Sequence, residues 1–401
     1  MITSENDQKL HNLTIEKDAT TVVPDGAKLI ITGECKNNGS LLVKGIVEFG
    51  NYTGAEDGSD KLYIINQVAG EDKRKTFNTT NGQKIGTLYV AGNVDLVLNG
   101  AVSVTKFETN AGDTNFIADD FTVNIGGTGS LSTTSMDFTR ASSTDGVIGT
   151  YKLNVPVTCS GKTVLHSGSK VYINEESSFT QIEYQGTDSP KPYLEINAKV
   201  SSDIVTTGIM ETVVTQNGNL EVGTLSSNAL LSNSGTISVE TAFTATNYLR
   251  PTDSTSDVVK IKEGATLSII NAATISNLNV VKTESPTNDF ATISTTGTLD
   301  VTNATYNIGD IQTNGIISLP DTTEDNKIGS LKIESGKLTI DKLHVNSLNV
   351  VAGTIESATV NVTGDITNNG ISDSVNIDEL NILDSSLVVI YRLQISINVS
   401  F

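Results

Sequence analysis

The spacing of short apolar pairs is the feature that most constrains the fold of this chain. Between Ser330 and Ile382, apolar and polar residues alternate in stretches too short for full strands joined by hairpins. Equivalent positions then return after 17 or 18 residues: Leu338 and Ile355, Leu343 and Val360, and Leu348 and Ile366. A fixed period in this range is typical of a solenoid, in which each rung buries its inner face by stacking on its neighbours.

Turn glycines repeat with the same period. Spacings of 17 or 18 residues separate Gly218 from Gly235, Gly297 from Gly315, Gly336 from Gly353 and Gly353 from Gly370. The sequence therefore predicts an all-β protein, a parallel β-solenoid (β-helix) with rungs of about 17–18 residues and loop insertions. With a strand spacing of ~4.8 Å, residues 86–384 would form roughly 16 rungs and a rod of about 80 Å.

A string of antiparallel β-sandwiches is the alternative fold, because sandwiches also show alternation and regular turns. Asn38-Gly39 and Asn99-Gly100 lie between apolar runs and are typical of hairpin turns. Such hairpin signals are sparse, so the solenoid is the favoured interpretation.

Composition divides the chain into four expected parts. These are an N-terminal cap or first rungs (1–50), a polar loop insertion (51–85), the solenoid rod (86–384) and an apolar C-terminal strand (385–401). The last part alternates strictly from Tyr391 to Phe401, which resembles a closing strand of an outer-membrane barrel. A terminal solenoid strand, or the cut end of a longer chain, is the preferred interpretation.

Four segments rich in Pro, Asp and Thr are expected to leave the rungs as loops: 183–193, 251–258, 282–290 and 320–328. Loops on a rigid scaffold commonly carry function, so binding is expected there.

The charge balance excludes two classes of partner. The chain has 26 Lys and Arg against 46 Asp and Glu, a formal net charge of −20. Nucleic-acid binding requires basic surfaces, and docking on anionic membranes does too. No stretch is apolar enough for a membrane-spanning helix. The first ten residues lack a cationic start followed by an apolar run, so either the protein stays in the cell or a leader lies upstream.

The two cysteines, Cys35 and Cys159, have no further Cys or His at metal-ligand spacing. Buried thiols are expected, with a single long-range disulfide as the alternative.

The sequence contains no known catalytic motif. His11, His166 and His344 have no partner at metal spacing, and His344 is expected to point outward from a strand between Leu343 and Val345. There is no nucleophile elbow, phosphate loop or dinucleotide fingerprint. Gly126, Gly127 and Gly129 form a glycine-rich turn, but no helix follows it to bind phosphate.

Carboxylates are the side chains of this sequence whose chemistry suits catalysis or calcium binding. Glu356 and Asp373, 17 residues apart, are placed to stack on successive rungs, as in polysaccharide lyases and hydrolases. The chain has four Arg (Arg74, Arg140, Arg250 and Arg392) and no Trp to support such a site. Two groups of acidic residues have a composition that suits Ca²⁺, but neither follows a known calcium-loop pattern. The first group is Glu56, Asp57 and Asp60, and the second is Asp113, Asp119 and Asp120. We therefore predict no catalytic, cofactor-binding or metal-binding residues and no cofactor.

Stretches such as Ile293–Thr305 and Asn217–Leu225 resemble the passenger domains of bacterial autotransporter adhesins and large surface antigens. The likeness lies in Thr-, Asn- and Gly-rich rungs, few Cys, no Trp and an acidic charge. It implies a secreted or outer-membrane-tethered rod that displays binding loops.

We therefore expect a non-enzymatic, elongated cell-surface or secreted protein that acts in adhesion or structural display. Its expected partner is a host or matrix protein or a glycan receptor. The alternatives are a carbohydrate-active β-helix enzyme, either a polysaccharide lyase or a hydrolase, and a phage or viral fibre component.

Overall fold

The computed structural model describes residues 7–66, 74–79, 82–109, 120–138, 148–185, 190–250, 256–282, 290–352, 354–363, 365–368, 375–382, 388–390 and 394–395. Within these residues the regular structure consists of strands, with no helix and therefore no helix that could cross a membrane. The strands pair in parallel and form a β-solenoid, as predicted, which has about 16 turns in all. The chain divides into two units, residues 1–212 and 213–401.

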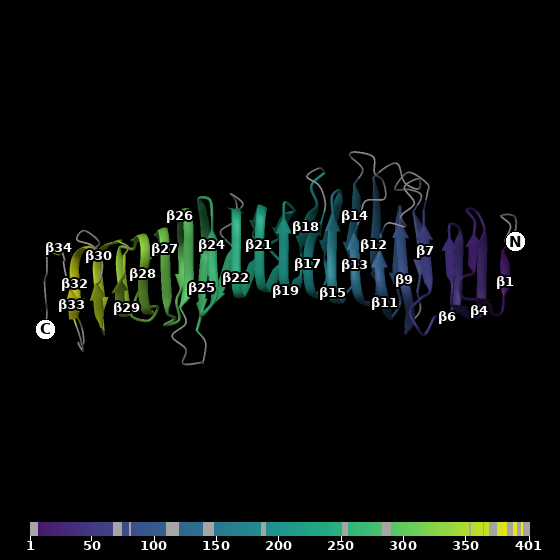
Figure 1. Ribbon diagram of the computed structural model, residues 1–401, viewed down its shortest axis with the longest axis horizontal. Coiled ribbons are helices and arrows are strands. Elements are labelled where there is room, and N and C mark those ends of the chain that lie inside the picture. Colours follow the sequence, from purple (N-terminus) through teal and green to yellow (C-terminus); the bar gives the residue numbers. More distant parts are fainter. Residues whose placement is uncertain are drawn as a thin grey trace. The chain divides into compact units, whose positions relative to one another are not determined.

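Unit 1 contains the following strands: β1 (Gln8–Leu10), β2 (Leu13–Ile15), β3 (Thr20–Val23), β4 (Lys28–Asn37), β5 (Ser40–Val43), β6 (Ile46–Gly54), β7 (Lys61–Ile65), β8 (Lys75–Asn78), β9 (Gln83–Ala91), β10 (Val94–Leu98), β11 (Ala101–Glu108), β12 (Phe121–Gly127), β13 (Ser130–Phe138), β14 (Gly149–Leu153), β15 (Val157–His166), β16 (Ser169–Ile173), β17 (Ser177–Gln185), β18 (Tyr193–Ile196) and β19 (Lys199–Gly208). Most strands pair with the strand two places along the chain, for example β11 with β9 and β13. Successive rungs therefore stack in chain order within the unit (Figure 1).

Strand β20 (Glu211–Val214) lies at the division between the units. Unit 2 contains β21 (Asn219–Asn233), β22 (Thr236–Leu249), β23 (Val258–Lys262), β24 (Thr266–Ile269), β25 (Ala273–Val281), β26 (Ala291–Thr305), β27 (Ile311–Ser318), β28 (Ile328–Thr339), β29 (Lys342–Val350), β30 (Thr354–Val362), β31 (Ile366–Asn368), β32 (Val375–Ile382), β33 (Val388–Ile390) and β34 (Gln394–Ile395). β34, within the expected C-terminal strand, pairs in parallel with β32.

The strand register confirms the predicted period where it was clearest. Leu338 stands beside Ile355, Leu343 beside Val360 and Leu348 beside Ile366. Other rungs are longer, because segments are inserted between their strands: Val94 stands beside Val123, and Thr266 beside Thr292. The period of 17–18 residues thus describes the shortest rungs.

Alternating apolar residues fill the interior, because successive side chains of a strand point to opposite faces. One inner column of unit 1 follows the register of β5, β7, β9, β11 and β13, and its members are at most 1% exposed: Leu41, Leu62, Leu88, Phe107 and Met136. Burial of such a side chain contributes about 1.5–3 kcal/mol. Each rung thus gains stability mainly from the rungs on either side of it.

An aromatic cluster fills the interior of unit 1 between β11 and β14. The Phe138 ring lies 5.1 Å from that of Tyr151 and 5.9 Å from that of Phe107, and Phe121 packs edge-on against Tyr151. Phe107, Phe138 and Tyr151 are fully buried. These large side chains occupy space that smaller residues fill in other rungs.

Glycines allow the corners of neighbouring rungs to approach closely. A Cβ on Gly235 would lie 2.3 Å from the carbonyl oxygen of Gly218, and one on Gly39 would lie 2.4 Å from that of Ala19. Gly39 belongs to a corner between β4 and β5, each of which pairs in parallel with other strands. The predicted alternative of hairpin turns at Asn38-Gly39 and Asn99-Gly100 is therefore wrong.

The structure differs from the sequence interpretation in residues 51–85. This interval, expected to be a polar loop, contains β7, β8, the end of β6 and the start of β9. Leu62, Ile64 and Phe77 point into the core, but charged neighbours obscured their short alternation. Residues 8–54 likewise form solenoid rungs.

The expected loops fall between strands, except that their end residues belong to β17, β18, β23 and β28. Residues 186–189, 251–255 and 283–289 of three of them lie outside the described residues. The fourth, 320–328, connects β27 to β28. Cys35 and Cys159 are both buried and both free, as the first interpretation predicted. Burial raises the pKa of the Cys35 thiol to about 12.

Arg74 ties three rungs of unit 1 together. Its Nε donates to Asp95 Oδ1 at 2.8 Å, and a terminal nitrogen donates to the carbonyl oxygens of Val94 and Thr122. Burial raises the pKa of Asp95, but hydrogen bonds from Arg74 and Asn124 and the Arg74 charge outweigh it, so the net pKa is lowered.

We expect Arg74→Gln to lower the free energy of unfolding by about 1–2 kcal/mol at pH 7. A depressed carboxyl pKa stabilises the fold above its unfolded value of about 3.9, and this stabilisation is lost as pH falls through the folded pKa. Urea unfolding of the wild type, Arg74→Gln, Asp95→Asn and the double variant would measure the coupling. A coupling that persists unchanged at pH 2 would contradict the prediction.

Candidate functional site

An open groove of about 450 Å³ crosses four rungs of unit 1. It is lined by Ala55, Glu56, Asp57, Gly58, Lys84, Ile85, Gly86, Ser103, Val104, Thr105, Ser132, Thr133, Thr134, Thr158 and Ser160. Strands β9, β11, β13 and β15 form its floor, and the segment between β6 and β7 forms its end. We call this feature the hydroxyl groove.

The floor of the hydroxyl groove follows from strand alternation and register. Lys84, Ser103, Ser132 and Thr158 stand side by side on successive rungs and point outward. The hydroxyl oxygens of Ser103 and Ser132 lie 3.2 Å apart. Hydroxyls of one column therefore form a ladder with the ~4.8 Å repeat of the strands.

An acidic turn closes one end of the groove. Its residue Asp57 accepts hydrogen bonds from the backbone and hydroxyl of Ser59, which lower the pKa of this exposed carboxyl. Gly58 has φ of 69° and passes so close to Gly86 that a Cβ on Gly86 would lie 2.2 Å from the Gly58 carbonyl oxygen. Two glycines thus let the turn lie directly on the strand face.

Three buried polar residues hold this turn in place, and we call them clamp 1: Asn37, Tyr52 and Asp60. Asn37 Nδ2 donates to the Tyr52 hydroxyl at 2.9 Å, which donates to Asp60 Oδ2 at 3.0 Å. Asp60 Oδ1 accepts hydrogen bonds from the backbone amides of Ala55 and Gly86. Clamp 1 therefore links the turn to both the preceding strand and the groove floor.

The buried setting of clamp 1 disfavours its charged forms. Asp60 is fully buried, and burial raises its pKa despite the hydrogen bonds it accepts. Burial and the nearby Asp60 charge raise the pKa of Tyr52 well above its usual value. Tyr52 is thus a permanent hydroxyl donor to Asp60.

Unit 2 contains the same arrangement, which we call clamp 2: Asn233, Tyr248 and Asp257. Asn233 Nδ2 lies 3.1 Å from the Tyr248 hydroxyl, which donates to Asp257 Oδ2 at 2.9 Å. The Asn–Tyr spacing is 15 residues in both clamps. In both, the Asn side-chain oxygen accepts from a corner glycine, Gly39 or Gly235.

The two clamps differ at one carboxylate oxygen. Asp257 Oδ1 is buried and has no hydrogen-bond partner within the described residues. In clamp 1 the equivalent oxygen receives the amide of Ala55, three residues after the tyrosine. The residue three after Tyr248 is Pro251, which has no N–H to donate. Clamp 2 is therefore less completely hydrogen-bonded.

A smaller pocket of about 310 Å³ lies beside clamp 2, at the place that the hydroxyl groove takes beside clamp 1. The backbone amide of Ser276 donates to Asp257, just as the amide of Gly86 donates to Asp60, so Ser276 and Gly86 occupy equivalent positions. Two residues earlier in each strand, Thr274 therefore corresponds to Lys84. In the next rung Asp300 stands beside Thr274, so Asp300 takes the position in this pocket that Ser103 takes beside Lys84 in the hydroxyl groove. Arg250, which donates to Ser276, also lines this pocket. The charges of the two sites are therefore reversed. Beside clamp 1 the floor contributes a cation, Lys84, and the turn contributes carboxylates. Beside clamp 2 the floor contributes a carboxylate, Asp300, and Arg250 contributes the cation.

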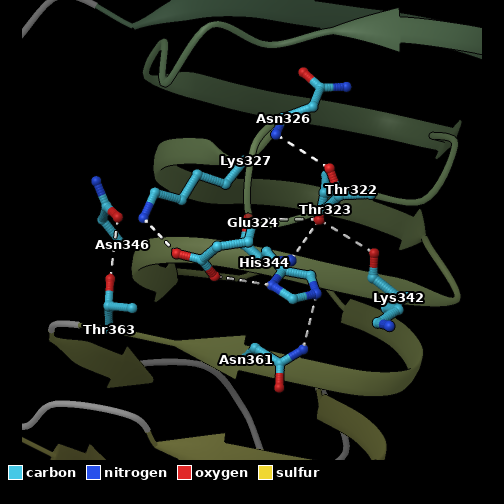
Figure 2. A network of polar contacts seen from close by, with 10 residues as sticks. All are labelled: Thr322, Thr323, Glu324, Asn326, Lys327, Lys342, His344, Asn346, Asn361 and Thr363. Carbon is cyan, nitrogen blue, oxygen red and sulfur yellow. Dashed lines mark hydrogen bonds and ion pairs between the residues drawn. The ribbon is translucent and has the colours of Figure 1, made fainter.

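The connection from β27 to β28 forms a polar corner with β29 and β30 (Figure 2). The exposed Glu324 carboxylate lies 3.1 Å from Lys327 Nζ and 3.5 Å from His344 Nδ1, and Lys327 followed by His344 lowers the pKa of Glu324. His344 Nε2 lies 3.2 Å from Asn361 Nδ2. These contacts fix the connection to its neighbours.

The buried Thr322 hydroxyl completes this corner by bonding to the Lys342 carbonyl oxygen and the His344 amide. His344 points outward from its strand, as predicted. The prediction that the 320–328 loop carries function stays a prediction.

The other residues weighed in the sequence do not converge on one site. Asp60 belongs to clamp 1, so it does not form a ligand set with Glu56 and Asp57, and no three His, Cys, Asp or Glu within the described residues could hold a metal. Glu356 stands beside Asn376 in the next rung. Asp373, the residue that the sequence spacing placed near Glu356, lies outside the described residues. Asp113 and Asp119 also lie outside them.

The remaining residues have local contacts. His11 lies 3.4 Å from the Thr32 hydroxyl and His166 lies 3.1 Å from Asp137. The turn with Gly126, Gly127 and Gly129 stacks on the corner at Gly100.

The sequence interpretation missed the hydroxyl groove and both clamps. The sequence does contain a signal for the clamps. Both begin with the pattern Asn-x-Gly-Ser/Thr, and both have Asn-Tyr at the same distance after it; the pattern occupies residues 37–40 in clamp 1 and 233–236 in clamp 2. Compared with known proteins, the chain matches no protein family, no curated protein and no solved structure.

Proposed function

We propose that this protein is a non-enzymatic surface or secreted solenoid that binds a receptor in adhesion or display. The observation that carries the proposal is the hydroxyl groove, a preformed concave surface on a rigid strand face whose end is held by clamp 1. Binding sites are commonly largely formed before the ligand arrives. The groove presents hydroxyls on successive rungs, which suits recognition of an extended partner.

Electrostatics support a role outside nucleic-acid biology. The net charge of −20 repels polyanions and keeps a repetitive surface soluble. The likeness to autotransporter passenger domains supports export to the cell surface or the medium. The groove lining includes Glu56 and Asp57, but both side chains are exposed. Hydrogen bonds from Ser59 lower the pKa of Asp57, whereas a general acid at neutral pH needs a raised one.

Location and adhesion test the proposal together. Intact cells that make the protein would be treated with protease, and the released peptides identified by mass spectrometry. We expect peptides from this chain, and we expect beads coated with the purified chain to adhere to cells or matrix. Recovery from the cytoplasm alone would overturn the proposal, and recovery from virions would favour a fibre component.

The enzyme alternative requires a separate measurement. Polysaccharides incubated with the purified chain would be assayed for new reducing ends and for unsaturated products. We expect neither to form. Turnover that is lost in a Glu56→Gln, Asp57→Asn variant would replace the binding role by a carbohydrate-active one.

A further inference from the structure

We propose that the hydroxyl groove of unit 1 binds an extended, uncharged glycan chain that runs across the rungs. The inference rests on the proposed receptor-binding function and names its ligand. The chemistry, the repeat and the charge of the groove floor support this ligand.

The floor offers groups that both donate and accept hydrogen bonds. A Ser or Thr hydroxyl has one donor and two acceptor positions, and a sugar hydroxyl has the same capacity. The side chains of Thr105, Thr134 and Thr158 have no hydrogen bond to protein within the described residues. These hydroxyls are free to exchange water for the hydroxyls of a ligand.

An added peptide strand does not fit this floor. Peptides that join a sheet bond to the unpaired backbone of an edge strand. Strand β11 is paired on both sides, with β9 and β13, and β13 is paired with β11 and β15. Recognition on the floor must therefore use side chains.

The repeat of the floor matches a polymer better than a compact ligand. Equivalent hydroxyls recur at the strand spacing of ~4.8 Å, close to the advance per sugar of an extended glycan. The groove crosses four rungs, so a chain of roughly four sugars laid along it meets hydroxyls on β11, β13 and β15 and the Lys84 ammonium on β9.

The charges favour a neutral glycan. Glu56 and Asp57 close one end of the groove, and the whole chain has a net charge of −20, so an anionic polysaccharide is repelled. Lys84, the one cation among the described lining residues, can donate to a sugar oxygen. No described lining residue is aromatic, so binding depends on hydrogen bonds and is weak, on the order of millimolar for a short oligosaccharide. Polymers would bind more tightly through multivalency.

The test uses cellohexaose, xylohexaose and mannohexaose as probes. Saturation-transfer NMR would detect binding by the full chain, and affinity electrophoresis in gels containing the matching polymers would rank it. We expect at least one neutral glycan to bind and Ser132→Val with Thr134→Val to weaken retention at least tenfold. The matched control is Thr292→Val with Ser294→Val, which replaces two hydroxyl residues with the same spacing on the outward face of β26 in unit 2. It should retain full binding. Circular dichroism would show that both variants fold.

Two results would overturn the inference: no binding to any neutral glycan, or equal binding by the groove variant and the wild type. Binding confined to polygalacturonate or to a peptide library would overturn it as well. The inference and the proposed function can fail separately. A surface-exposed, adhesive protein that ignores neutral glycans would refute only the ligand, whereas a cytoplasmic protein that binds them would refute only the surface role.

Discussion

Phe138→Ala is expected to lower the free energy of unfolding of unit 1 by about 3–5 kcal/mol, the range for removing a fully buried aromatic ring. Phe138 is 0% exposed and contacts the rings of Phe107 and Tyr151, which come from the neighbouring strands β11 and β14. The surrounding side chains relax only partly after such a substitution, so a cavity remains and adds to the cost. Urea unfolding followed by circular dichroism would measure the loss.

The damage should be local, because repeat proteins gain stability mainly from neighbouring rungs. Hydrogen exchange should accelerate in β11, β13 and β15 and remain unchanged in unit 2. The control Ile204→Ala, at a position 42% exposed, should change stability by less than about 0.5 kcal/mol. Equal effects of the two substitutions would mean that the aromatic cluster does not support these rungs.

Asp60→Ala is expected to destabilise unit 1 by about 3 kcal/mol or more, since it leaves two buried donors and one partly buried donor without an acceptor. Those donors are the Tyr52 hydroxyl and the amides of Ala55 and Gly86. The matched variant is Asp257→Ala in clamp 2, where the carboxylate accepts from Tyr248 and Ser276 on one oxygen. Its cost should be smaller. Thermal unfolding of both variants would rank them, and an equal or reversed order would contradict the hydrogen-bond account.

The pH dependence of Asp60 should have the opposite sign to that of Asp95. Burial raises the folded pKa of Asp60 above its unfolded value of about 3.9, so the folded state binds a proton more readily. Stability contributed by this group is then full below about pH 3.9 and is lost as pH rises through the folded pKa. The difference between wild type and Asp60→Asn should therefore shift in favour of wild type on acidification to about pH 4. A shift in favour of the variant would show that hydrogen bonds outweigh burial.

The rungs could be predicted from the sequence where insertions are absent. Between Ile328 and Ile366 the turns are short, so inward pairs such as Leu343/Val345 and Val360/Val362 return at a constant interval. In unit 1 the interval changes from rung to rung, as between Val94 and Val123. The alternation of buried residues such as Leu96 and Leu98 continues there, but it does not show which strands are neighbours. In residues 51–85, strands of four or five residues among charges gave too little alternation to recognise.

The candidate site was harder to predict, for a physical reason. A groove floor is made by residues that share an outward column, and column membership depends on register. Ser103 and Ser132 are neighbours although they lie 29 residues apart in the sequence, well beyond the period of 17–18 residues. Clamp 1 joins Asn37, Tyr52 and Asp60 through side chains whose separate positions carry no periodic signal. Only the recurrence of the same residues in unit 2 distinguishes them from ordinary surface polar residues.

The two buried, unpaired cysteines make unit 1 independent of the redox state of its surroundings. With no disulfide to form, the fold does not require an oxidant, and reducing agents remove nothing from it. Burial and the raised pKa also protect the Cys35 thiol from alkylating reagents while its rung is closed. Cys35 and Cys159 lie in different rungs, β4 and β15, so their alkylation rates would time the opening of each rung separately. The chain thus contains two natural reporters of local unfolding, and no label needs to be introduced.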